Sequence, residues 1–236
     1  MKKFFSLTKR FIQETDNLLL LLITATSIFG VLMVYSTTRC LLEDGQTIAR
    51  DATVMIIAAA LGIIATLVIS SIDYELIMKL WPIIAGFCVA LMVLTLAIGA
   101  APEERPDSRC WIKIGSIYFQ SSELVKIGFL ITFSMHLELV RDSINSLKSV
   151  IALGIHAMVP IGLVILTGDM GSALVFMIMA VGLLFFAGLH WGYFACGGLL
   201  LLASSPLIWM FVFSEYQKNR FLALFRPEQF TNESFQ

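Results

Sequence analysis

The sequence has few charged residues. Only 14% of its 236 residues are Asp, Glu, Lys or Arg, whereas 58% are hydrophobic, and a soluble domain carries about 25% charged residues. A water-soluble fold of this composition lacks the polar residues needed to cover its surface. The formal net charge is −1, so no excess of one sign indicates a nucleic-acid-binding protein. The composition predicts an integral membrane protein.

Residues that bind metals are also scarce. The four cysteines are Cys40, Cys88, Cys110 and Cys196. No two of them form a Cys-x-x-Cys pair, the spacing typical of a zinc site. The sequence therefore indicates no cofactor, and it contains no motif for binding a divalent cation. Cys88 and Cys196 lie in apolar runs and are expected to pack there. His136 and His156 are expected to be hydrogen-bonded packing residues, because neither has a second ligand at metal spacing.

Long apolar runs are abundant. A transmembrane helix needs about 20 predominantly apolar residues, and seven segments qualify or nearly do. They are Asn17–Thr37, Ala52–Ile72, Leu80–Ala101, Glu123–Leu139, the segment between Lys148 and Asp169, and two runs within Met170–Ser214. Gly188, His190 and Trp191 mark the expected break between the last two. Barrel strands are shorter and alternate in polarity. The predicted fold class is therefore all-α, a polytopic transmembrane helical bundle of about seven spans.

Positive charges give the expected orientation. Lys2, Lys3, Lys9 and Arg10 precede the first span, and such residues favour the cytoplasm. With a cytoplasmic N-terminus, the loop after span three, the turn after span five and the tail after span seven are extracytoplasmic. The outer segments then carry Arg39, Arg50, Arg105, Arg109, Lys113, Lys218, Arg220 and Arg226. Either the orientation is inverted, or acidic neighbours neutralise these cations, or the cations bind an anionic headgroup or pyrophosphate.

Ionisable residues within a span indicate function, because charge is costly in a bilayer. Lys126 follows Glu123 by three positions, so the two side chains share a helix face and can pair. The alternative is that Lys126 extends to the interface by itself. Asp169 precedes the sixth span, where it can cap the helix. A capping Asp can also face a cavity, so the two roles are compatible.

The loop before the fourth span is amphipathic and aromatic, with the sequence WIKIGSIYFQ at 111–120. One interpretation is an interfacial belt, because Trp and Tyr concentrate at the level of the lipid headgroups. The other is a wall of a lipid-binding groove. By topology this loop, the Glu123–Lys126 pair, Asp169 and the tail cations face the same side. Their convergence predicts that a charged lipid is handled there.

These residues resemble the SEDS family, whose members are RodA, FtsW and SpoVE, over essentially the whole chain. The most specific similarity is WIKIG at 111–115 followed by FQSSELVK at 119–126, which is similar to the family's W-I-x-x-G…Q-P-S-E-L-x-K stretch. MVYS at 33–36, DMGSA at 169–173, YQKNR at 216–220 and FRP at 225–227 add to it. Ser121 and Gly168 stand where the family has proline, and Thr167 where it has glutamine, so the sequence resembles a divergent member.

The resemblance implies a peptidoglycan glycosyltransferase that polymerises lipid II at the outer face of the bacterial cytoplasmic membrane. It implies a class B penicillin-binding protein as partner and a role in cell shape or division, with RodA slightly preferred. The family's catalytic Asp lies further along the large extracytoplasmic loop, beyond Gln236. We therefore expect residues 1–236 to be one SEDS-type membrane domain, truncated within that loop and inactive alone.

The expected site has two parts. Glu123, Lys126 and Asp169 are expected to form one supporting charge network, in which Lys126 neutralises both carboxylates. The lipid-substrate groove is expected to include Arg109, Trp111, Lys113, Gln120, Ser122, Lys218 and Arg220. The alternative functions are a flippase for a lipid-linked precursor and a non-catalytic scaffold for a penicillin-binding protein. A flippase needs a polar path to the inner face, and spans two, three, six and seven contain little polarity, which favours the polymerase.

Overall fold

The computed structural model describes residues 17–39, 50–69, 74–101, 108–115, 117–211 and 213–225. The N-terminal cations, Cys40, Arg105 and Arg226 lie outside these ranges, so the predictions made for them are not addressed by the structure. The chain divides into two compact units, Met1–Ile77 and Met78–Gln236. The short helix α4 (Tyr74–Lys79) crosses the division.

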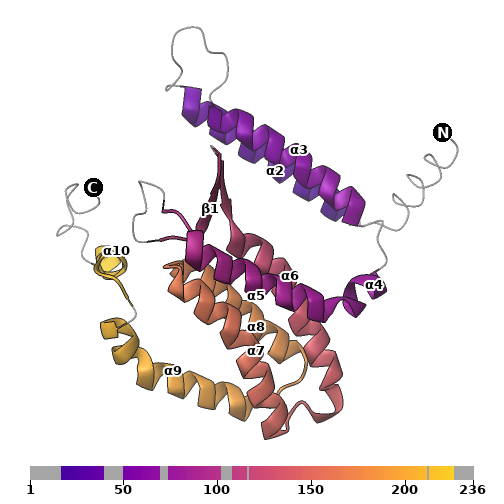
Figure 1. Cartoon of the computed structure of the whole chain (residues 1–236), viewed down its shortest axis with the longest axis vertical. Helices are drawn as coiled ribbons and strands as arrows, with labels where there is room; N and C mark the ends of the chain where they lie inside the picture. The colour runs from indigo at the N-terminus through magenta and orange to yellow at the C-terminus, as the bar shows by residue number, and fades with distance from the viewer. Residues whose placement is uncertain are drawn as a thin grey trace, which may run out of the picture. The chain divides into compact units, whose positions relative to one another are not determined.

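The first unit is a pair of apolar helices. These are α2 (Asn17–Thr38) and α3 (Arg50–Ile69), which pack side by side (Figure 1). Gly30 allows a close approach at this contact, because a Cβ placed there would lie 3.3 Å from the Met55 methyl group. Most other apolar side chains of both helices are exposed. Helices that are apolar on every side belong in a membrane or in a larger core.

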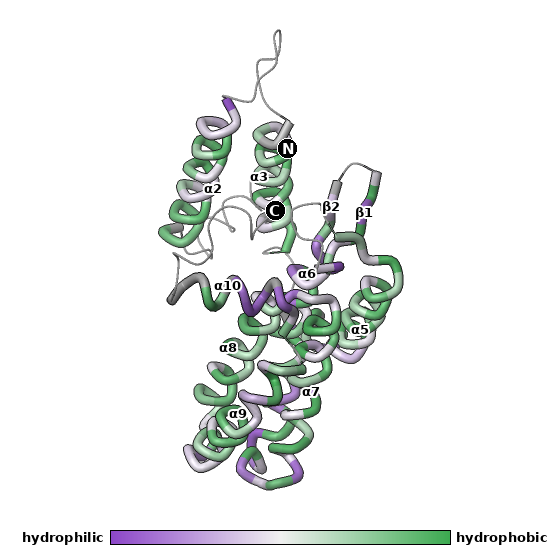
Figure 2. The backbone as a smooth tube through the Cα atoms, turned by 90° about the vertical axis from the view of Figure 1, so that its left-hand side faces the viewer, coloured by the Kyte–Doolittle hydropathy of each residue, from purple (hydrophilic) through white to green (hydrophobic). Residues whose placement is uncertain are grey.

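The second unit is a helical bundle with one β-hairpin. Its elements are α5 (Trp81–Ile98), β1 (Trp111–Ile114), β2 (Ile117–Gln120), α6 (Ser121–Leu139), η2 (Arg141–Ser143), α7 (Leu147–Leu166), α8 (Met170–Phe186), α9 (Trp191–Phe211) and α10 (Glu215–Phe225). Helices α5, α6 and α7 pack against one another, and α8 packs against α6 and α7. Figure 2 shows hydrophobic residues along α7 and α8, and hydrophilic residues gathered in α10 and at the start of α6.

The core of the second unit is aromatic. Phe129 and Phe133 stack within α6 with their ring centroids 5.0 Å apart, and Phe176 of α8 packs edge-on against Phe129 at 5.4 Å. Met92 of α5 and Leu153 of α7 are also fully buried in this cluster. Such aromatic pairs stabilise a core beyond the area that they bury. This cluster holds α5, α6, α7 and α8 in one arrangement.

Glycine sets the spacing of α5 and α6. A Cβ placed at Gly128 of α6 would overlap the Sγ atom of Cys88 on α5. Small residues of this kind let helix backbones approach closely in membrane proteins. The packing of α5 on α6 therefore requires the absence of a side chain at Gly128.

The seven predicted apolar segments all fold as helices, namely α2, α3, α5, α6, α7, α8 and α9. The predicted break between the last two is confirmed: α8 ends at Phe186, Gly188 adopts a φ of 85°, and α9 begins at Trp191. Within the described residues, α2, α5, α7 and α9 are long and apolar enough to cross a membrane. Shorter apolar helices cover Ala52–Thr66 and α8.

The β-hairpin is a departure from the all-α prediction. Strands β1 and β2 pair antiparallel, with Trp111 opposite Gln120 and Ile114 opposite Ile117. Gly115 begins the turn with a φ of 62°, a conformation that glycine adopts without steric penalty. The β-branched isoleucines on both sides of the turn favour the strands. The segment predicted to be an amphipathic loop is thus an ordered hairpin.

Helix α10 lies in the tail that was predicted to be a loop. Its start is stabilised by a reciprocal pair of bonds: the Ser214 N–H donates to Gln217 Oε1 at 3.1 Å, and the Gln217 N–H donates to Ser214 Oγ at 3.3 Å. This is a capping box, which satisfies the free N–H groups of a first helical turn. The Ser-x-x-Gln spacing at 214–217 was the sequence signal for this helix.

Substituting Gly128 by Ala should lower the stability of the second unit by about 1–3 kcal/mol, because the added methyl group overlaps Cys88 Sγ. Thermal unfolding of the purified protein in lipid nanodiscs measures the effect. Gly154→Ala in α7 is the matched control, since no neighbouring atom lies within 4 Å of a Cβ placed there. Adding Cys88→Ala should restore stability to Gly128→Ala. Equal stability of Gly128→Ala and Gly154→Ala would contradict the packing described for α5 and α6.

Candidate functional site

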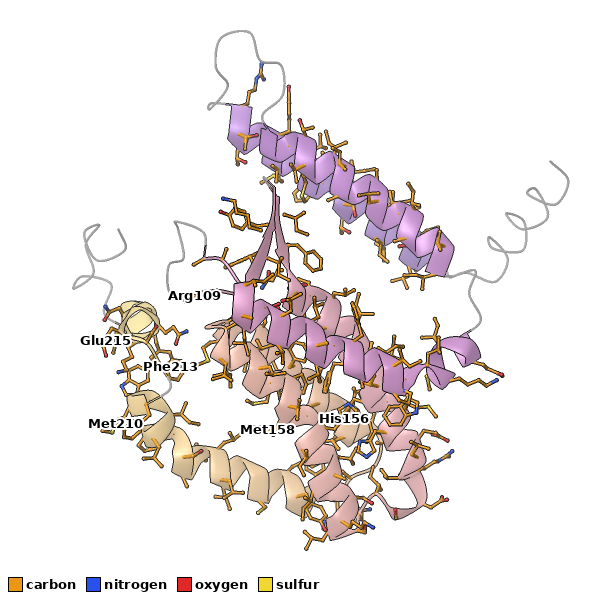
Figure 3. The ribbon with its side chains drawn as sticks, viewed as in Figure 1. Arg109, His156, Met158, Met210, Phe213 and Glu215 are labelled. Carbon is orange, nitrogen blue, oxygen red and sulfur yellow. The ribbon has the colours of Figure 1, made fainter. Side chains whose placement is uncertain are left out.

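One end of the second unit brings four segments together. These are the end of α5, the segment before β1, the start of α6 and the turn between α7 and α8. The Ala100 N–H donates to the Trp111 carbonyl at 2.7 Å, and the Arg109 N–H donates to the Thr167 carbonyl at 2.9 Å. Gly99 must be glycine at this junction, because a Cβ there would overlap the Arg109 carbonyl oxygen. Figure 3 labels Arg109 beside the base of the hairpin.

Asp169 lies at the centre of this end. It is only 8% exposed, and both of its carboxylate oxygens accept hydrogen bonds. Oδ1 accepts from the Ser172 N–H at 3.1 Å and so caps α8, as predicted. Oδ2 accepts from Gln120 Nε2 at 2.7 Å and from the Ser122 hydroxyl at 3.5 Å. The carboxylate thus joins the start of α6 to the start of α8.

Lys126 and Glu123 form the predicted ion pair on α6. The Lys126 ammonium lies 2.7 Å from Glu123 Oε1, and the side chains are 21% and 59% exposed respectively. Of the two predicted alternatives for Lys126, the structure therefore shows the ion pair with Glu123 of the same helix.

Asp169 and the Lys126–Glu123 pair are separate hydrogen-bonded groups. Among the residues that the structure describes, Lys126 is bonded to Glu123, and Asp169 is bonded to Gln120, Ser122 and Ser172. The structure brings Lys126 to one of the two predicted carboxylates and does not bring it to the other. Both groups involve the first turns of α6, which carry donors to Asp169 as well as the ion pair.

The expected groove residues of the hairpin lie on its surface. Trp111 is half-buried, and Lys113 and Arg109 are exposed. The Lys113 ammonium lies 5.6 Å from the ring centroid of Tyr118, its partner across the two strands. This distance is within the range of a cation–π interaction. Accessible positive charge is therefore present on the segment before β1 and on the hairpin, at the same end of the unit as the buried Asp169.

Helix α10 reaches the same end through a residue outside the predicted set. Gln217 Nε2 donates to the Gly168 carbonyl at 3.2 Å, directly before Asp169. Lys218 of this helix pairs with Glu215 at 2.8 Å, and Figure 3 labels Glu215 on α10. Arg220 also belongs to α10, but its side chain lies outside the described part of the structure.

Cys110 is a second buried residue at this end that sequence reasoning did not place there. Its thiol accepts a hydrogen bond from the Ser108 hydroxyl at 3.3 Å. Burial raises the pKa of the Cys110 thiol to about 11, and the nearby Asp169 carboxylate acts in the same direction. The thiol is therefore neutral and unreactive at physiological pH. No motif in the sequence indicated that Cys110 lies next to Asp169.

His136 and His156 are hydrogen-bonded residues packed within the bundle, as predicted, and they bond to each other. Their Nδ1 atoms lie 2.9 Å apart, and His156 Nε2 lies 3.2 Å from Thr132 Oγ1. His156, labelled in Figure 3, lines a mainly apolar cavity of about 220 Å³ between α5, α6 and α7. Within the described ranges, no group of three or more His, Cys, Asp or Glu residues is arranged to hold a metal ion.

The chain matches known proteins along most of its length. Residues 16–236 match the family model FtsW/RodA/SpoVE, described as cell cycle protein. The chain is 27% identical over 230 residues to the probable peptidoglycan glycosyltransferase FtsW of Polynucleobacter necessarius subsp. necessarius (strain STIR1), covering 95% of this chain and 54% of that protein. It is 26% identical over 214 residues to the peptidoglycan glycosyltransferase MrdB of Escherichia coli (strain K12), covering 90% and 55%. The chain spans about half the length of these curated relatives.

Two solved structures share the fold. One is a chain from a study of how a peptidoglycan synthase complex coordinates polymerization and crosslinking, with a TM-score of 0.69 and 23% identity over 91% of this chain and 60% of that chain. The other is a mutant of the rod shape determining protein RodA of Thermus thermophilus, with a TM-score of 0.66 and 23% identity over 80% and 59%. The match over 16–236 and this shared helical membrane fold show that the chain belongs to the FtsW/RodA/SpoVE family of cell cycle proteins.

Proposed function

We propose that this chain belongs to a peptidoglycan glycosyltransferase that polymerises lipid II at the outer face of the bacterial cytoplasmic membrane. The observation that carries the proposal is the family match over residues 16–236. Curated relatives that align over 90% or more of the chain are named peptidoglycan glycosyltransferases. Both FtsW and RodA proteins are among the relatives, so the proposal covers cell shape and cell division alike.

In this proposal the helices of all seven apolar segments cross the membrane and the N-terminus is cytoplasmic. The hairpin, the start of α6, the Asp169 turn and α10 then lie at the outer face. The hydrogen bonds that join these segments support their placement on one side, since one end of a bundle faces one side of a membrane. A lipid-linked substrate would meet this end with its headgroup, while its hydrocarbon chain stays in the bilayer.

The charged residues are proposed to bind and orient the substrate. Cations at the outer end attract the pyrophosphate of a lipid-linked sugar, and Lys or Arg binds phosphate oxygens by charge-assisted hydrogen bonds. The residues proposed for this groove are Arg109, Trp111, Lys113, Gln120, Ser122, Lys218 and Arg220. Glu123 lies in the first turn of α6 and Lys126 in the second, and the pair sets the charge beneath the start of this helix. We assign binding and positioning to this chain, and no residue of it as the catalytic base.

A class B penicillin-binding protein is the proposed partner. Support comes from the fold shared with a chain of a peptidoglycan synthase complex in which polymerization is coordinated with crosslinking. A polymerase and a crosslinking enzyme act on the same glycan strand, so their association is chemically reasonable.

Lys126→Met in the full-length protein should reduce polymerisation of lipid II by about tenfold or more, because Glu123 loses its ion-pair partner beneath the site. Glycan strands made from labelled lipid II by the purified variant, separated on a gel, measure the rate. Lys148→Met, at an exposed position on α7, is the charge-matched control and should polymerise normally. A Lys126→Met variant with normal thermal stability and normal polymerisation would refute the role given to Lys126.

Asp169 has two roles that substitution can separate. Asp169→Asn keeps an oxygen that can cap α8 and removes the charge, whereas Asp169→Ala removes both. We expect Asp169→Ala to lose about 1 kcal/mol of stability, and Asp169→Asn to lose less. Both variants should polymerise lipid II poorly, because the charge that orders Gln120 and Ser122 is absent from each. Normal polymerisation by Asp169→Asn would show that Asp169 serves only as a helix cap.

A further inference from the structure

Three consecutive residues around the start of α6 point their side chains in two directions. Gln120 and Ser122 both donate to Asp169 Oδ2. Ser121, between them, turns towards α5, where its Oγ atom lies 2.7 Å from Oγ1 of Thr95. Side chains at consecutive positions of a helix diverge by about 100°, so one short segment can contact α5 and the Asp169 turn at once.

The Thr95–Ser121 contact is fully enclosed. Both residues are fully buried, so neither hydroxyl can exchange its partner for water. Thr95 Oγ1 also lies 2.8 Å from the Leu91 carbonyl oxygen, and the Ser121 hydroxyl is directed at Met92 Sδ at 3.9 Å. A buried hydroxyl that loses its partner is strongly unfavourable. Leu91, Met92 and Thr95 all belong to α5, so the hydrogen bonds of Ser121 tie the first turn of α6 to that helix.

Among the residues that the structure describes, no capping side chain fixes the start of α6. Gln120 occupies the N-cap position, and its side chain makes no capping hydrogen bond because its amide is directed at Asp169. Helix starts are normally held by a capping side chain that binds the free N–H groups. Here the hydrogen bond that Thr95 donates to Ser121 fixes the first turn of α6 from a different helix, beside the bonds that Gln120 and Ser122 donate to Asp169.

We infer that Thr95 and Ser121 are positioning residues for the Asp169 carboxylate. Their hydrogen bond ties the first turn of α6 to α5, and this holds Gln120 and Ser122 where both reach Asp169. Neither Thr95 nor Ser121 contacts Asp169 through any hydrogen bond that the described structure contains. The geometric part of the inference stands without the proposed function, whereas its effect on catalysis rests on that function.

Cys110 reports on this arrangement without any enzymatic assay. The thiol is buried beside Asp169, so it reacts with maleimide only when this end of the bundle opens. The experiment uses the whole chain in nanodiscs, with Cys40, Cys88 and Cys196 replaced by Ala, at pH 8. Thr95→Val and Ser121→Ala should each speed the modification of Cys110 by about fivefold to tenfold. Thr95→Ser, which keeps the hydroxyl, should restore the slow rate.

A matched control separates positioning from general loss of stability. Thr132 is also a buried threonine, and it bonds to His156 away from the polar end. Thr132→Val should leave the Cys110 rate unchanged even where it lowers thermal stability. The Thr95→Val, Ser121→Ala double variant should be no faster than either single variant, because the two residues act through one bond. Unchanged rates in the single variants, or rates that multiply in the double variant, would overturn the inference.

Lipid II polymerisation by the full-length protein gives the second readout. Thr95→Val and Ser121→Ala should slow polymerisation by about the factor by which they speed Cys110 modification, and Thr95→Ser should restore it. Normal polymerisation in variants whose Cys110 is rapidly modified would overturn the positioning role. Absence of polymerisation in the unsubstituted full-length protein would instead contradict the proposed function, and the Cys110 rates would then decide the inference on their own.

Discussion

The buried Asp169 carboxylate is the group on which the polar end of the bundle depends. A carboxylate away from water is unfavourable unless hydrogen-bond donors surround it, and its donors come from Gln120, Ser122 and the N–H of Ser172. Gln120 and Ser122 belong to the start of α6 and Ser172 to the first turn of α8, so all three reach Asp169 only when the two helices begin close together. The turn that carries Asp169 also accepts bonds from the segment before β1 and from α10. The Asp169 carboxylate and the two backbone carbonyls before it thus gather four segments that are far apart in the sequence.

Below this end the second unit is held by apolar contacts. The rings of Phe129, Phe133 and Phe176 fill the space between α6 and α8, and Gly128 brings α6 against Cys88 of α5. In a bilayer these contacts replace contacts between helix and lipid with contacts between helices. Close packing therefore contributes more to their stability than the exclusion of water does. Polar groups within the bundle are paired, as the His136–His156 bond shows, and no described buried side-chain polar atom lacks a partner. The polar end is therefore presented by a rigid apolar support.

The sequence was sufficient to predict the helices and several local contacts. Apolar runs located seven helices because a bilayer selects for their length and composition, and Gly188 located a break because its backbone conformation requires glycine. The Glu123–Lys126 pair was predictable because it is set by helical spacing alone. The hairpin was missed although Gly115 and Ser116, between two runs of β-branched and aromatic residues, are a hairpin signal. Here a local pattern was present and was interpreted as an amphipathic loop.

Contacts between helices could not be predicted in the same way. The bonds from Gln120 to Asp169 and from Thr95 to Ser121 join residues 49 and 26 positions apart, and helical periodicity does not determine which faces meet. The predicted topology placed the Trp111 loop and Asp169 on the same side, and the expected charge network placed Lys126 with both carboxylates. In the structure Lys126 is bonded to Glu123. Asp169 accepts its hydrogen bonds from neutral groups, namely the side chains of Gln120 and Ser122 and the Ser172 N–H. The site is therefore an arrangement of tertiary contacts on a scaffold that the sequence predicts well.

The most direct test of this account is whether the full-length protein polymerises lipid II. The purified protein would be incubated with labelled lipid II in nanodiscs, alone and with a class B penicillin-binding protein whose own activity is blocked. The account predicts glycan strands that disappear when the full-length protein is omitted. A folded protein that produces no strands under either condition, while it moves lipid II across the bilayer or only binds the penicillin-binding protein, would contradict it.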